Sequence, residues 1–97
     1  MKTMTIKKNI ATATKILKAM ANKKRLLILC ALDEGEKSVG QLEVIADLSQ
    51  SALSQHLAKL RHDKIVKTRR DAQTIYYSIN EKAVPAVIKT LMTYLET

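Results

Sequence analysis

The sequence has little of several residue types that often define a fold. Its 97 residues include no tryptophan or phenylalanine, three tyrosines, two glycines, one proline and one cysteine. A single cysteine excludes an internal disulfide framework and a cysteine-rich zinc site. Without tryptophan or phenylalanine the core must be aliphatic, which favours packed helices. At this length we expect one core and one domain, 1–97.

Long apolar runs are also missing. No stretch approaches the ~18 consecutive apolar residues of a transmembrane helix. The N-terminal residues 1–15 lack the apolar centre of a signal peptide. These features predict a cytoplasmic protein that does not insert into a membrane.

Acidic residues are outnumbered by basic ones. The chain has 17 Lys and Arg residues against nine Asp and Glu, a net charge of +8. Such an excess indicates a polyanionic partner, and nucleic acid and an anionic membrane surface are the two candidates. The sequence has no phosphate-binding glycine loop, and its histidines, His56 and His62, have no acidic partner at a diagnostic spacing. We therefore expect no enzyme activity, no catalytic residues, no bound metal and no cofactor.

Apolar residues recur at helical spacing in five segments, and the period changes to strict alternation between the last two. The alternation predicts a β-hairpin over 64–80, with its loop at 71–73. This pattern predicts a mainly α fold with a β-hairpin wing, which is a winged helix-turn-helix. The predicted helices are 6–20, a second beginning after the N-cap Asn22 and ending in the acidic loop 33–36, a third beginning after Ser38, a fourth over 48–63 with Ser49 as N-cap, and a last over 82–96 with Pro85 in its first turn.

The third and fourth helices, joined by the short connection 46–49, form a helix-turn-helix unit over 38–63. The fourth helix buries a leucine stripe and has no acidic residue before Asp63. A polar helix face of this kind fits the major groove of B-form DNA. The alternative is an ordinary solvated helix face. The polar face consists of Gln50, Ser51, Ser54, Gln55, Lys59 and His62.

The hairpin carries four cations in seven residues: Lys64, Lys67, Arg69 and Arg70. We expect Lys67, Arg69 and Arg70 to contact a minor groove or the flanking phosphates. The alternative is an exposed sheet edge that uses charge to resist aggregation.

A third basic group occupies the first turn of the second helix. Lys23, Lys24 and Arg25 oppose the helix dipole there, unless an anion binds. Contact with a DNA phosphate is one interpretation, and simple exposure to solvent is the other.

The outer helices, 6–20 and 82–96, carry more apolar surface than a small core can absorb. Pairing of these helices between two copies would give a two-fold homodimer that binds a palindromic site. The alternative is that both helices pack only within the monomer.

Four segments resemble the ArsR/SmtB family of repressors: LKAMANKKRLLILCAL, SVGQL, LSQSALSQHLAKLR and DAQTIYYSI. The resemblance extends over residues 10–95 and is strongest to the HlyU/YgaV/BigR-like branch. It implies a homodimer that binds an inverted repeat through its winged helix-turn-helix. It also implies that Gln50, Ser51, Ser54, Gln55 and His56 read the major groove. Because His56 borders the buried leucine stripe, a packing role remains an alternative.

The departures from the family concern its sensor sites. The Cys-x-Cys pair of the metal sensors corresponds here to Ser38 and Gly40, and no histidine follows His62, so we expect no metal sensing. The resembled branch implies a two-cysteine thiol switch, of which this chain has only Cys30. That thiol can still be oxidised, or it is an inert part of the apolar face. Nothing in the sequence identifies an inducer.

Another departure follows the recognition helix, where family members commonly carry glycine and this chain has Lys64. A left-handed backbone there would favour glycine over lysine by about 1 kcal/mol.

Two other functions stay open beside repression. One is a winged-helix module that binds protein, and the other is an activator that displaces a silencing protein.

Overall fold

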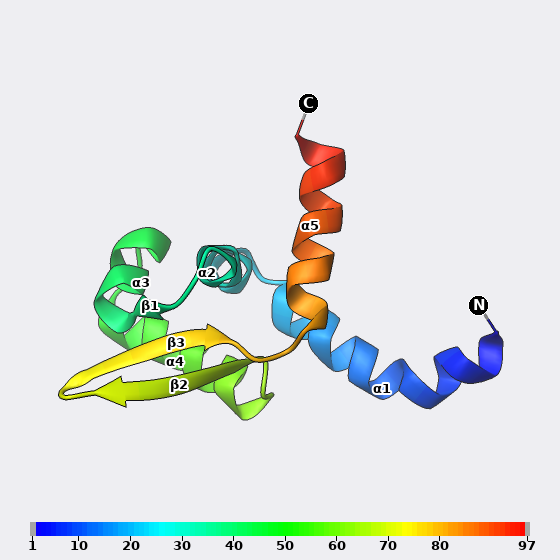
Figure 1. The fold of residues 1–97 in the computed structure, drawn as a ribbon, viewed down its shortest axis with the longest axis horizontal. Helices are drawn as coiled ribbons and strands as arrows, with labels where there is room; N and C mark the ends of the chain where they lie inside the picture. The colour runs from blue at the N-terminus through cyan, green and yellow to red at the C-terminus, as the bar shows by residue number, and fades with distance from the viewer. Residues whose placement is uncertain (1, 97) are drawn as a thin grey trace.

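The computed structural model describes residues 2–96 and contains five helices and a small antiparallel sheet (Figure 1). This confirms the predicted winged helix-turn-helix arrangement. The helices are α1 (Thr3–Met20), α2 (Lys23–Asp33), α3 (Val39–Ala46), α4 (Gln50–His62) and α5 (Ala83–Leu95), and the strands are β1 (Lys37–Ser38), β2 (Val66–Asp71) and β3 (Thr74–Ile79).

Three of the helices begin at the predicted N-caps. The Asn22 side chain accepts hydrogen bonds from the backbone N–H groups of Lys24 and Arg25 at 3.1 and 3.0 Å. Ser38 and Gln41 form a reciprocal capping box at the start of α3. Ser49 accepts from the backbone of the first turn of α4 at 3.2 Å. Each cap satisfies backbone donors that a helix leaves unpaired at its start.

The sheet has three strands, in the order β1-β3-β2, whereas the sequence predicted only the β2–β3 hairpin. The additional strand is two residues long and pairs Lys37 with Tyr77 and Ser38 with Tyr76. A two-residue segment is too short to show alternation, and its pairing partner lies far along the chain. The missed strand matters because it ties the hairpin to the start of α3.

The core lies between the helices and one face of the sheet. Leu53, Leu57 and Leu60 are buried at 0, 2 and 0% exposure, as the leucine stripe predicted. In α2 the side chains of Ile28, Leu29 and Leu32 are buried, while Cys30 is only half-buried.

The α4 helix ends in a left-handed residue, Lys64, with φ of 59°. The Lys64 N–H bonds to the carbonyl of Arg61 at 3.0 Å, and the Ile65 N–H bonds to that of Leu60 at 2.9 Å. This pair of hydrogen bonds is the Schellman ending, in which glycine usually occupies the left-handed position. Lys64 therefore has the left-handed backbone that would favour glycine at this position.

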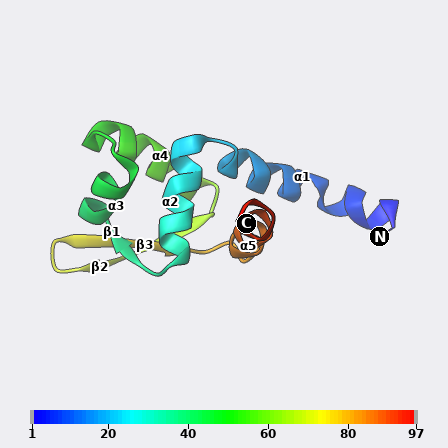
Figure 2. The same ribbon diagram turned by 90° about the horizontal axis from the view of Figure 1, so that it is seen from above.

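Helices α1 and α5 project from the rest of the molecule (Figures 1 and 2). The N-terminal part of α1 extends away from the sheet, and α5 extends in a different direction. Large apolar side chains on both helices are exposed, including Ile10 at 53%, Leu17 at 56% and Leu95 at 70%. Within residues 2–96, no helix is long and apolar enough to cross a membrane.

Candidate nucleic-acid interface

Helix α4 presents the predicted polar face to solvent. Its three leucines anchor the opposite side in the core and so fix the rotation of the helix. His56 is half-buried, at the border between the two faces. All the residues predicted for the polar face are exposed: Gln50, Ser51, Ser54, Gln55, Lys59 and His62.

A groove of about 630 Å³ separates α4 from the sheet. Gln50 and Ser54 line it on the helix side, and Ile75 and Tyr77 line it on the sheet side. The groove therefore joins the first turns of the recognition helix to the wing.

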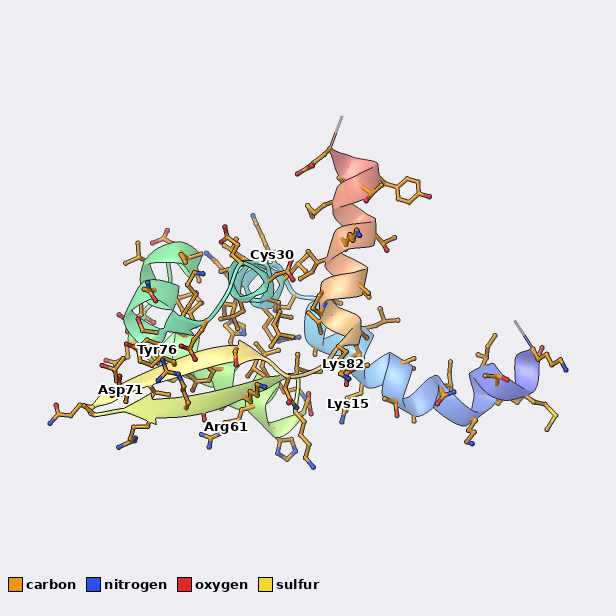
Figure 3. The ribbon with its side chains drawn as sticks, viewed as in Figure 1. Lys15, Cys30, Arg61, Asp71, Tyr76 and Lys82 are labelled. Atoms are coloured by element: carbon orange, nitrogen blue, oxygen red, sulfur yellow. The ribbon has the colours of Figure 1, made fainter. Side chains whose placement is uncertain are left out.

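Arg61 is a candidate contact that the sequence reasoning missed. It is exposed, lines the groove near the end of α4, and lies beside the hairpin in Figure 3. The helical spacing of Gln50, Ser54 and Arg61 places the three residues on one side of α4. This spacing was the signal that could have identified it.

The wing arginines lie on opposite faces of the hairpin. Arg70 pairs across the strands with Ile75, and directly opposed residues share a face of the sheet. Since Ile75 lines the groove, Arg70 is on the groove side. Arg69 pairs with Tyr76 and lies on the other face, together with Lys67. The predicted set of Lys67, Arg69 and Arg70 is thus divided between two surfaces.

Arg69 is already occupied by an acidic partner. Its Nε and Nη2 atoms each donate a hydrogen bond of 2.7 Å to a carboxylate oxygen of Glu36. Its guanidinium also lies over the Tyr76 ring, 4.4 Å from the centroid. These hydrogen bonds lower the pKa of Glu36 and raise the pKa of Arg69.

Lys59, another predicted contact on α4, forms an ion pair with Asp63. Its Nζ lies 3.1 Å from a carboxylate oxygen of Asp63, one turn later on the helix. The lysine side chain is 57% exposed and that of Asp63 is 11% exposed, so Lys59 holds its partner from the solvent side.

The basic group at the start of α2 serves mainly to join helices. Lys24 Nζ donates to the carbonyl of Ala46, the last residue of α3, at 2.6 Å. Arg25 donates to the carbonyls of Ala19 and Lys18 at the end of α1, at 2.8 and 3.0 Å. Cationic side chains stabilise helix C-termini in this way. Lys23, the third member of the group, is exposed.

Cys30 lines a shallow apolar hollow on α2 with Lys23, Leu26 and Leu27. Burial raises the pKa of its thiol, and the negative charge of Asp33 raises it further. A raised pKa keeps the thiol protonated and poorly nucleophilic near neutral pH. The possible redox role of Cys30 stays a prediction.

Comparison with known proteins places this geometry in a family. Residues 22–68 match the sequence profile described as "Bacterial regulatory protein, arsR family". The transcriptional activator HlyU of Vibrio cholerae is 54% identical over 86 residues, which cover 89% of this chain and 80% of HlyU. The HTH-type transcriptional regulator YgaV of Escherichia coli is 51% identical over 80 residues, covering 81% of each protein.

The structural comparison agrees. The crystal structure of the transcriptional repressor BigR from Xylella fastidiosa superimposes with a TM-score of 0.92 at 34% identity, covering 100% of this chain and 99% of BigR. The match includes the helix-turn-helix, the hairpin and both projecting helices. The chain therefore belongs to the ArsR family of bacterial regulatory proteins and is a DNA-binding transcriptional regulator.

Proposed function

We propose that the protein binds an inverted repeat in promoter DNA as a homodimer and represses transcription. In this proposal α4 enters the major groove and the hairpin lies along the adjacent minor groove. Because its target is chromosomal DNA, the protein acts in the cytoplasm of a bacterial cell. No small-molecule inducer is part of the proposal.

The observation that carries the proposal is the exposed face of α4. Ser49 caps the helix and the buried leucines fix its rotation, so that Gln50, Ser51, Ser54 and Gln55 project together near its N-terminus. Hydrogen-bonding side chains of this kind match base edges, with Gln suited to adenine. His56 contributes at the edge of this set.

The groove beside α4 supports a path for the DNA backbone. Arg61 lines the groove and Arg70 lies on the hairpin face that borders it. Their positive charges complement the phosphates of the strand between the two DNA grooves. We assign phosphate contacts to Arg61, Arg70 and Lys23, with Lys59 and Lys67 contributing charge nearby.

The homodimer is supported by exposed apolar surface on the outer helices. Leu17 of α1 and Leu91 of α5 line a common shallow groove, together with Val87. Leu17 and Leu91 are 56% and 39% exposed in the single chain. A second copy would bury this surface and set two recognition helices on the two halves of an inverted repeat.

Activation is the second candidate function, and the relatives provide the reason. HlyU is named a transcriptional activator and BigR a transcriptional repressor, although both resemble this chain. A reporter gene behind each bound promoter separates the two, because repression lowers and activation raises expression. Unchanged expression from every bound promoter would contradict both.

The first test is selection of bound sequences from a random duplex pool, with untreated and peroxide-treated protein. We expect an enriched inverted repeat. General, salt-sensitive binding without enrichment would contradict sequence-specific regulation and favour an architectural or protein-binding role. Loss of binding after peroxide treatment of wild type, but not of a Cys30→Ser variant, would establish Cys30 as a redox sensor.

Two variants test the assignment of contacts. Gln55→Ala should relax the preference at one base pair, at a cost of about 1–3 kcal/mol on the selected site and little on random DNA. Arg70→Ala should weaken binding to both DNAs and reduce the salt slope by about one unit. Equal losses on both DNAs for both variants would remove Gln55 as a base reader.

The dimer is tested by Leu17→Glu, which places a charge on the exposed apolar face. Ala11→Glu is the matched control, because Ala11 is an exposed residue of the same helix outside that face. Sedimentation should show a dimer for wild type and the control, and a monomer for Leu17→Glu. A dimeric Leu17→Glu would contradict the assigned interface.

A further inference from the structure

Three strands are bridged on the solvent-facing side of the sheet by one ion pair. Glu36 immediately precedes β1, Arg69 lies on β2, and the Arg69 guanidinium lies over the Tyr76 ring of β3. Both guanidinium hydrogen bonds are 2.7 Å long. A bidentate pair of this kind constrains orientation as well as distance. The position of Tyr76 on β3 can be followed in Figure 3.

Strand β1, which follows Glu36, connects directly to the first helix of the helix-turn-helix. β1 ends at Ser38, and α3 begins at the next residue. The edge of the sheet formed by β1 has only two residue pairs with β3. Val66 and Tyr77 are buried in the core and fix the base of the hairpin, so the ion pair adds a constraint nearer the tip of the wing, where Arg69 and Arg70 are exposed.

We propose that Glu36 and Arg69 form a clamp that sets the orientation of the wing relative to the recognition helix. Arg69 is then a positioning residue, and it affects DNA binding through the placement of the hairpin. The groove-facing Arg70 makes the wing's contact with DNA. This inference rests on the proposed function for its effect on DNA, and on the ion pair alone for its effect on the hairpin.

The geometry favours this role over a direct contact of Arg69 with DNA. Two of the three guanidinium nitrogens already donate to Glu36, and the flat face is stacked on Tyr76. Contact with a phosphate would require the loss of a charge-assisted pair that is already made. The strand register also places Arg69 on the face opposite the groove.

The test compares Glu36→Gln with Arg69→Gln on the selected duplex. A clamp requires both partners, so both variants should weaken binding by about two- to fivefold, the range of an exposed ion pair. Both should also lose hydroxyl-radical protection in the flanking minor groove, with protection of the central major-groove contacts retained. Glu34→Gln is the matched control for loss of a negative charge, because Glu34 is an exposed acid of the same loop.

A charge exchange completes the test. The double variant Glu36→Arg/Arg69→Glu preserves net charge and reverses the pair, and it should regain most of the affinity and flanking protection lost in Arg69→Gln. Opposite effects, with Glu36→Gln binding tighter than Glu34→Gln and Arg69→Gln binding weaker, would show that Arg69 contacts DNA and would overturn the clamp. Unchanged binding in both single variants would also overturn it.

Hydrogen exchange without DNA separates this inference from the proposed function. The amides that pair β1 with β3 should exchange faster in Glu36→Gln and Arg69→Gln than in wild type and Glu34→Gln. Unchanged exchange would overturn the clamp even if DNA binding is confirmed. Faster exchange in a protein that selects no DNA sequence would retain the clamp and reject the proposed function.

Discussion

Replacement of Lys64 by glycine should stabilise the protein. The residue has φ of 59° at the end of α4, and its side chain is exposed. A left-handed backbone costs a residue with a Cβ roughly 1–2 kcal/mol. Glycine avoids that cost but loses about 0.5–1 kcal/mol more conformational entropy on folding. The net gain expected for Lys64→Gly is about 0.5–1 kcal/mol.

The assay is thermal unfolding followed by helical circular dichroism at one fixed protein concentration. For a domain of this size the gain corresponds to a rise in Tm of roughly 2–8 °C. Lys64→Ala is the control, because alanine removes the charge and the long side chain but keeps the Cβ. Alanine should leave the Tm near that of wild type.

The comparison between the two variants isolates the backbone. Both lose the same positive charge, so any change in DNA binding should be shared, whereas only glycine relieves the left-handed strain. A Lys64→Gly protein no more stable than Lys64→Ala would refute the reasoning. It would mean that the hydrogen bonds of the Schellman ending hold the lysine at no appreciable cost.

Three further predictions concern single groups. In Arg69→Gln the pKa of Glu36, measured by NMR of the side-chain carboxyl, should rise toward its ordinary value, and an unchanged Glu36 titration midpoint would contradict the pairing. Because the pair lowers the pKa of Glu36 in the folded state, its contribution to stability is present above the ordinary glutamate pKa and is lost as the pH falls through the lowered value. At pH 7 Cys30 should react with iodoacetamide more slowly than glutathione does, and Asp33→Asn should speed the reaction because it removes a charge that raises the thiol pKa; a wild-type rate equal to that of glutathione would count against the raised pKa. Asn22→Ala should lower the free energy of unfolding by about 1 kcal/mol in urea denaturation, and Asn22→Ser should retain most of it; equal losses would mean that the cap is not the source of the effect.

Much of the fold could be predicted because its determinants are local. Asn22, Ser38 and Ser49 begin helices since each needs only the amides of the next turn. The leucine stripe of α4 and the alternation of the hairpin are periodic patterns within one segment. The polar face of α4 then follows, because burying one side of a helix exposes the other.

The tertiary structure decided which cations are free. Lys24 and Arg25 lie next to each other in sequence with Lys23, yet they bond to the carbonyl ends of two different helices. Arg69 and Glu36 are 33 residues apart, and only the sheet brings them together. Sequence alone determined that the start of α2 and the hairpin would carry clusters of positive charge. Tertiary structure determined that Lys24 and Arg69 are occupied, because their partners, the Ala46 carbonyl and the Glu36 carboxylate, lie on segments distant along the chain.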